Sequence, residues 1–229
     1  MTTSVKICGL TDEQGLDTAL AGGADYAGLV FFAKSPRHLS MDRAVALRER
    51  VPRNGQCKVV ALMVDPSDVE LTEVIGRVDP DYIQLHGHEA VERVAAIRNR
   101  FHKPILKAVP VLRATDVQNG RAYFDPGRLA DILLFDARPD PDATLPGGNG
   151  VAFDWQIFEG LGELPPFALA GGLTVENVAG AIACTGAAIV DVSSGVESAP
   201  GRKDPELIRR FLRNAKAAKQ DLNATPSGV

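Results

Sequence analysis

Short apolar segments alternate along the whole chain with longer segments that have helical spacing. Eight segments have the length and apolar content of buried strands, and they cover residues 5–9, 26–32, 57–64, 82–87, 104–111, 131–136, 167–171 and 187–193. Helix-start residues lie between several of them, at Thr11-Asp12-Glu13, Ser40, Thr174 to Asn177, and Asp204-Pro205. Strict alternation of strand and helix predicts parallel strands that are joined by helical crossovers.

Eight such units in 229 residues predict an α/β protein that folds as a single (β/α)8 TIM barrel. We expect the barrel domain to span residues 1–222 and residues 223–229 to form a disordered C-terminal tail. An open doubly wound sheet is the alternative architecture. No Gly-x-Gly-x-x-Gly motif follows the first strand, so a dinucleotide site is not supported. The long connection at residues 137–153 has a length typical of functional or disordered loops.

Composition narrows the class of protein. The chain is 45% hydrophobic, and 25 Lys and Arg stand against 29 Asp and Glu, which disfavours a nucleic-acid binder. No apolar run approaches the roughly 20 residues that span a bilayer, and the first residues lack the pattern of a secretory signal. The 3 cysteines are far apart and show no Cys-x-x-Cys spacing, so neither a disulfide framework nor a structural metal site is indicated. We expect a reduced, cytoplasmic, soluble protein.

Polar residues gather where the predicted strands end, which is where barrels of this kind have their active sites. Cys8, His86 and Asp136 end the first, fourth and sixth strands. Cys8 has two interpretations from its local pattern alone: a reactive thiol, or a small residue buried for packing. His86 is equally a loop histidine or a ligand contact. A helix-capping role for Asp136 is less favoured, because the residues after it are not typical of a helix start.

Two glycine-rich turns are candidates for binding phosphate. One contains Gly171 and Gly172 after the seventh strand, and the other contains Ser193, Ser194 and Gly195 after the eighth. Glycines let backbone N–H groups approach an anion, serines add donors, and phosphate sites recur at these two places in barrels. Ordinary tight turns use the same residue types.

Charged and polar residues also interrupt the strand interiors. Arg37 follows the second strand in a loop stiffened by proline, and a guanidinium can bind a carboxylate through two N–H groups. Taken alone, its position favours a solvated surface arginine. Lys6, Gln84, Lys107 and Asp191 break apolar strands, and inside a barrel they need partners. Because the first and eighth strands are neighbours in a closed barrel, we predict that Lys6 and Asp191 approach each other.

These motifs occur together and in one order. They are Lys6-Ile7-Cys8-Gly9-Leu10-Thr11, Gly28-Leu29-Val30-Phe31-Phe32, Ser35-Pro36-Arg37, Gln84-Leu85-His86-Gly87, Leu134-Phe135-Asp136, Leu145-Pro146-Gly147-Gly148, Phe153-Asp154-Trp155, Leu169-Ala170-Gly171-Gly172-Leu173, Val192-Ser193-Ser194-Gly195-Val196-Glu197 and Pro200-Gly201-Arg202-Lys203-Asp204. The set resembles the phosphoribosylanthranilate isomerase family over nearly the whole chain. The resemblance implies a (β/α)8 barrel without a cofactor or metal that performs an Amadori rearrangement in tryptophan biosynthesis. Its partner is a phosphorylated sugar–anthranilate substrate, and we expect a monomer or homodimer.

The resemblance also assigns roles. Asp136 would be the general acid that opens the ribose ring, and Cys8 the general base that removes the proton from the second sugar carbon. Arg37 would hold the anthranilate carboxylate. The remaining substrate-binding residues would be Gly171, Gly172, Asp191, Ser193, Ser194 and Gly195, chiefly around the phosphate, with His86 in a binding or orienting role. A free carboxyl is ionised and a free thiol neutral at pH 7, so the site must shift or couple the two groups.

Two positions depart from the family pattern. Phe135 stands where leucine is common, and we expect it to face the helices; Met63-Val64-Asp65 also differs from the usual third strand end. Three other functions compete. The dual-substrate isomerase that also serves histidine biosynthesis carries aspartate in place of Cys8. A Schiff-base aldolase needs a lysine at a strand end, whereas Lys107 lies mid-strand. An inactive phosphate-binding barrel would not need both Cys8 and Asp136.

Overall fold

The computed structural model describes residues 3–124, 127, 129–138, 154–158, 160–161 and 164–221, with side chains to residue 218. Eight parallel strands form a closed barrel in chain order, as predicted. They are β1 (Ser4–Cys8), β2 (Tyr26–Phe31), β3 (Lys58–Met63), β4 (Tyr82–Leu85), β5 (Ile105–Val111), β6 (Ile132–Ala137), β7 (Phe167–Leu169) and β8 (Ile189–Val192). Each end lies within two residues of its predicted position. Residues 139–153 of the connection 137–153 lie outside the described residues, and so do residue 222 and the predicted tail at 223–229.

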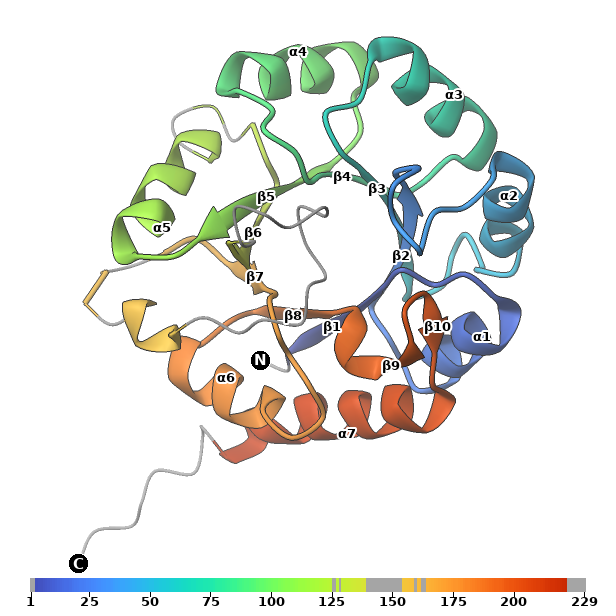
Figure 1. The fold of residues 1–229 in the computed structure, drawn as a ribbon. Helices are drawn as coiled ribbons and strands as arrows, with labels where there is room; N and C mark the ends of the chain where they lie inside the picture. The colour runs from blue at the N-terminus through green and yellow to red at the C-terminus, as the bar shows by residue number, and fades with distance from the viewer. Residues whose placement is uncertain are drawn as a thin grey trace, which may run out of the picture.

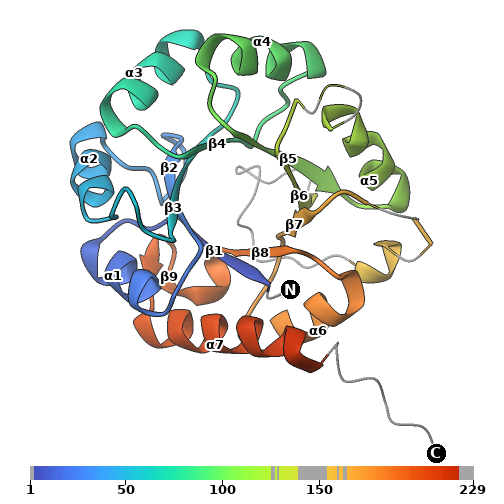
Figure 2. The same ribbon diagram turned by 180° about the vertical axis from the view of Figure 1, so that it is seen from behind.

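Helices form an outer ring around the barrel (Figures 1 and 2). They are α1 (Glu13–Ala21), α2 (Met41–Glu49), α3 (Asp68–Val78), α4 (Val91–Phe101), α5 (Ala114–Gly120), α6 (Val178–Thr185) and α7 (Pro205–Asp221), with the short helices η1 (Arg121–Tyr123), η2 (Trp155–Phe158) and η3 (Ser194–Val196). Asp12 and Ser40 cap α1 and α2 by accepting a backbone N–H, as their sequence pattern predicts. In the described residues, no helix is long and apolar enough to cross a membrane.

The apolar core lies mainly between the strands and the helices. Phe135 is 1% exposed and packs its ring against Phe158 of η2 and Phe167 of β7, at centroid distances of 5.6 Å and 5.4 Å. The prediction that Phe135 faces the outer layer is therefore confirmed. A smaller apolar cluster, which includes Leu106 and Leu134, fills the barrel interior.

Charged side chains inside the barrel are paired. Lys6 Nζ lies 3.0 Å and 2.9 Å from the two carboxylate oxygens of Asp191, which confirms the predicted approach. Lys107 lies 2.7 Å from Glu89, a residue of the loop after β4. Both cations are almost fully buried, and each carboxylate offsets much of the cost of that burial.

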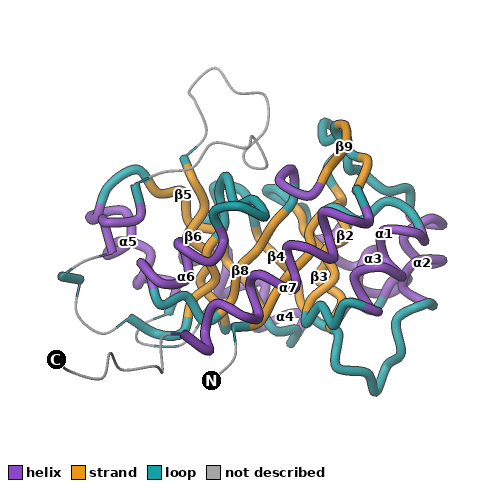
Figure 3. Tube along the Cα trace, turned by 90° about the horizontal axis from the view of Figure 1, so that it is seen from below, coloured by secondary structure: helices purple, strands orange, loops and turns teal. Residues whose placement is uncertain are grey.

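A short hairpin after β8 was not predicted. Residues Glu197–Ala199 (β9) and Arg202–Lys203 (β10) pair antiparallel and form a short hairpin between η3 and α7. Figure 3 shows β9 rising above the rim of the barrel that lies away from the N-terminus. The strands β7 and β8 carry the two glycine-rich turns to this same rim.

Candidate active site

Three of the predicted site residues lie at the carboxyl ends of their strands. Cys8 is the last residue of β1, Asp136 lies near the end of β6, and His86 directly follows β4. Cys8 and Asp136 are 5% and 6% exposed, so both are buried at the mouth of the barrel. The structure brings His86 and Asp136 together, with 3.3 Å between His86 Nε2 and Asp136 Oδ2.

A side-chain amide orients the His86 ring. Gln84 Nε2 lies 2.8 Å from His86 Nδ1. With this amide nitrogen as donor, Nδ1 accepts, and the ring proton of neutral His86 sits on Nε2, facing Asp136. Gln84 Oε1 is buried without a hydrogen-bond partner in the described part of the protein. The contact between His86 Nε2 and Asp136 Oδ2 holds the Asp136 carboxyl group at the barrel mouth.

Lys6 and Cys8 leave the same face of β1 and meet beside Gly28 of β2. A Cβ on Gly28 would lie 3.0 Å from Cys8 Sγ and 3.2 Å from Lys6 Nζ. Burial raises the pKa of the Cys8 thiol, and the neighbouring Lys6 ammonium opposes that rise. Burial acts to lower the pKa of Lys6, but Asp191 and Cys8 raise it above its ordinary value. Lys6 therefore stays protonated next to the thiol.

Buried Asp191 joins this group from the neighbouring strand. Burial raises the pKa of Asp191, and Lys6 acts against that rise. The charges of Asp136 and His86 also act on Asp191, so electrostatic coupling extends from β1 across the mouth of the barrel. Lys6, Cys8 and Asp191 therefore form one coupled set of ionisable groups.

The two glycine-rich turns contact each other through their backbones. A Cβ on Gly195 would lie only 1.9 Å from Leu173 O, so no side chain fits there. Gly171 has a φ of +86°, and a Cβ on it would lie 3.0 Å from Asp136 Oδ1. Ser194 and Gly195 open η3, where the first N–H groups have no acceptor within the helix. The structure thus brings together the two turns predicted to bind phosphate.

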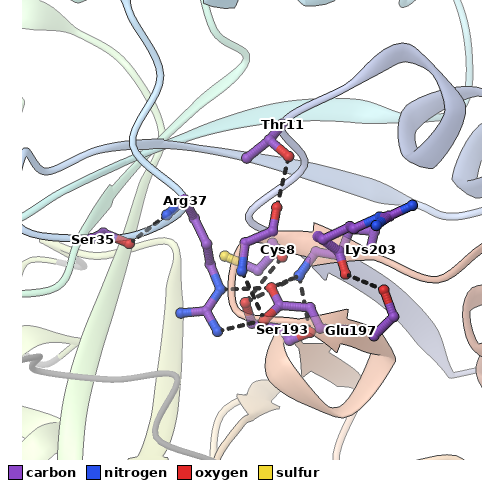
Figure 4. A network of polar contacts seen from close by, with 10 residues as sticks. Cys8, Thr11, Ser35, Arg37, Ser193, Glu197 and Lys203 are labelled. Atoms are coloured by element: carbon purple, nitrogen blue, oxygen red, sulfur yellow. Dashed lines mark hydrogen bonds and ion pairs between the residues drawn. The ribbon is translucent and has the colours of Figure 1, made fainter.

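The side chains of Ser193 and Arg37 form hydrogen bonds with other residues of the protein. The Ser193 hydroxyl donates to Cys8 O at 3.1 Å, so a contact between Ser193 and a phosphate would run through the backbone N–H. Arg37 is 6% exposed and donates from Nε and Nη2 to the two carboxylate oxygens of Glu197, at 2.7 Å and 2.9 Å. Figure 4 shows both residues in one network with Glu197 and Lys203.

The family model described as N-(5'phosphoribosyl)anthranilate (PRA) isomerase matches residues 5–214. The chain belongs to this family. It is similar to the N-(5'-phosphoribosyl)anthranilate isomerase of Paramagnetospirillum magneticum, at 51% identity over 96% of this chain and 100% of that protein. The protein of the same name from Paracoccus denitrificans is 52% identical over 95% of this chain and 99% of its own length.

Solved structures of PRA isomerases have the same fold. The Thermotoga maritima enzyme superposes with a TM-score of 0.81 at 32% identity, covering 94% of this chain and 99% of that one. A PRA isomerase in complex with reduced 1-(o-carboxyphenylamino)-1-deoxyribulose 5-phosphate gives a TM-score of 0.80 at 31% identity, with 94% and 99% covered.

No sequence motif assigned a role to Glu197, Lys203 or Glu89. The pair Pro200-Gly201 between Glu197 and Lys203 is a turn signal that would have indicated the hairpin. Within the described ranges, no three His, Cys, Asp or Glu side chains converge to hold a metal ion. The residues that do converge are suited to moving protons and binding anions.

Proposed function

We propose that this protein converts N-(5-phosphoribosyl)anthranilate into 1-(2-carboxyphenylamino)-1-deoxyribulose 5-phosphate, an Amadori rearrangement of tryptophan biosynthesis. The observation that carries the proposal is the pair Cys8 and Asp136, buried at one mouth of the barrel on strands that are not neighbours. An aldose-to-ketose conversion needs an acid and a base at different atoms of the sugar. Family membership supplies the substrate on which this pair would act.

The proposed reaction is an internal rearrangement that needs no oxidant, reductant or added group. Asp136 protonates the ribose ring oxygen, the bond from that oxygen to the first carbon breaks, and the nitrogen lone pair forms an iminium. Cys8 as thiolate then removes the proton from the second carbon, and the electrons of that bond give an enolamine that becomes the ketone. Lys6 supports this step, because an adjacent cation stabilises a thiolate. His86 orients Asp136 through the contact at 3.3 Å.

The substrate carries two anionic groups, a carboxylate and a phosphate. The site offers a guanidinium for the first and a cluster of backbone N–H groups for the second. Arg37 would bind the anthranilate carboxylate, since guanidinium and carboxylate form paired hydrogen bonds. Gly171, Gly172, Ser194 and Gly195 would bind the phosphate through backbone N–H groups, with Ser193 contributing its own N–H. Asp191 would face the substrate between these ends while Lys6 holds its carboxylate.

An assay of substrate fluorescence tests the proposal. Purified protein is mixed with fluorescent N-(5-phosphoribosyl)anthranilate, without added metal or cofactor, and the fluorescence should fall as product forms. A sample without protein gives the rate of spontaneous hydrolysis. Decay no faster than that sample would refute the isomerase assignment and favour a barrel that binds phosphate without catalysis.

We further propose that residues 1–222 form the catalytic domain and that the protein acts in the cytoplasm as a monomer or homodimer. A solved Thermotoga maritima relative of 31% identity is a dimeric isomerase of which monomers have also been generated, and it supports either state. Sedimentation of the full chain at several concentrations would distinguish the two.

A further inference from the structure

The β9–β10 hairpin contacts the loops that follow β1 and β2. Thr11 Oγ1, from the loop after β1, donates to Gly201 O at the hairpin turn, at 2.9 Å. A Cβ on Gly201 would lie 2.5 Å from Pro36 O, in the loop that carries Arg37. The hairpin lies near the C-terminal end of the sequence and packs against two loops from its N-terminal part.

The hairpin holds Arg37 through a buried carboxylate. Glu197 Oε1 accepts from Arg37 Nε at 2.7 Å and from Lys203 Nζ at 2.8 Å, and Glu197 Oε2 accepts from Arg37 Nη2 at 2.9 Å. The side chains of Arg37, Glu197 and Lys203 are 7%, 4% and 0% exposed. A guanidinium bound through two N–H groups in a buried site keeps one orientation.

A second branch of the network leads to the turn after β8. Lys203 Nζ donates to Ser193 O at 2.9 Å, and Ser193 Oγ donates to Cys8 O at 3.1 Å (Figure 4). A continuous chain of hydrogen bonds thus joins Arg37, Glu197, Lys203, Ser193 and the backbone of Cys8. It connects the proposed carboxylate-binding residue, Arg37, to the proposed phosphate-binding turn at Ser193.

We propose that Glu197 and Lys203 are positioning residues that hold the two anion-binding ends of the site at a fixed separation. Glu197 orients Arg37 toward the substrate carboxylate, and Lys203 fixes the backbone of Ser193 beside the phosphate. The inference rests on the proposed function, and it adds a residue pair that sets substrate affinity without touching the reacting atoms. Rigid groups of this kind bind more tightly because less freedom is lost on binding.

Two inhibitors that mimic the two ends of the substrate test this role: anthranilate for the carboxylate end and inorganic phosphate for the other. Glu197→Gln should weaken inhibition by anthranilate by at least about ten-fold, as expected when a charged hydrogen-bond partner is neutralised. Inhibition by phosphate should change by less than about two-fold, and KM should rise more than kcat falls. Lys203→Met should instead weaken inhibition by phosphate. Glu73→Gln, an exposed change in α3, is the matched control and should change neither constant.

A double variant separates positioning from general stability. Arg37→Ala alone should weaken anthranilate inhibition, and Arg37→Ala combined with Glu197→Gln should weaken it no further, because Glu197 acts through Arg37. Equal losses for both inhibitors in Glu197→Gln, or additive losses in the double variant, would overturn the inference. If Lys203→Met does not fold, Lys203→Gln replaces it. An inactive wild-type protein would refute the proposed function itself, whereas an active protein with unchanged inhibition in Glu197→Gln would refute only this inference.

Discussion

Replacing Lys6 by methionine removes the cation beside Cys8 and keeps a side chain of similar length in β1. Lys6 is fully buried, and its ammonium contacts Asp191 and faces the same space as Cys8 Sγ beside Gly28. Without that charge, an ionised Cys8 would lie in a buried site with Asp191 as its negative neighbour. We therefore expect Lys6→Met to raise the pKa of Cys8, and Asp191→Asn to lower it.

The size of the effect follows from the geometry. The distances of 3.0 Å and 3.2 Å to one point beside Gly28 place Cys8 Sγ and Lys6 Nζ no more than about 6 Å apart. At an effective dielectric constant of about 20, two unit charges at about 6 Å attract each other by about 3 kcal/mol. That energy corresponds to a fall of about 100-fold in the thiolate fraction at neutral pH.

Alkylation by iodoacetamide measures the thiolate, because the thiolate is the nucleophile. Cys184 is exposed, so the experiment uses a Cys184→Ser background and follows the Cys8 peptide by mass spectrometry. The alkylation rate at pH 7 should fall by about 100-fold in Lys6→Met and rise in Asp191→Asn. Lys6→Met leaves Asp191 without a partner; if it fails to fold, it is replaced by the double variant Lys6→Met with Asp191→Asn, which removes both charges. The alkylation rate of Cys8 in the double variant should lie between the rates expected for the two single variants. Equal rates in wild type, Lys6→Met and Asp191→Asn would refute the reasoning.

Three further predictions concern stability and pH. Burial raises the pKa of Cys57 from 9.0 to about 12. The free energy of unfolding should therefore fall as pH rises from 9 toward 12, because only the unfolded thiol ionises in that range. Urea unfolding should show that Cys57→Ala removes about 3 kcal/mol of the loss between pH 7 and pH 11. Burial lowers the pKa of Lys203 to about 8. Inhibition by sulfate, whose charge is constant in this range, should therefore weaken as pH rises through 8 and Lys203 loses its proton. Lys203→Arg should remove this pH dependence. Gly195→Ala forces a Cβ against Leu173 O, so it should lose about 2 kcal/mol of stability. Gly180→Ala, an open helical position, should gain about 0.5 kcal/mol instead.

The barrel could be predicted because each strand carries its own apolar pattern. Closure also makes β1 and β8 neighbours, so the partner of Lys6 followed from topology before any distance was known. The strand ends were less well defined, since Gly171 and Ser193 leave the strand conformation where the turns begin to pack against each other. These limits come from contacts between turns, which a local pattern does not contain.

The network around Arg37 could not be predicted in the same way. β9 and β10 have 3 and 2 residues, too few to show a period of two. Glu197 and Arg37 are 160 positions apart, and a glutamate in a polar segment is usually exposed. Only the folded chain shows that the Glu197 side chain is buried and that two cations bind it.

The most direct test of the central claim compares the turnover of N-(5-phosphoribosyl)anthranilate by the wild-type protein, Cys8→Ala and Asp136→Asn. Thermal unfolding of each variant shows whether it keeps the fold. Loss of a general acid or base predicts that each variant turns over at least about 100-fold more slowly than the wild type while remaining folded. Full activity in folded Cys8→Ala would contradict the account and would leave that thiol a packing residue of the barrel.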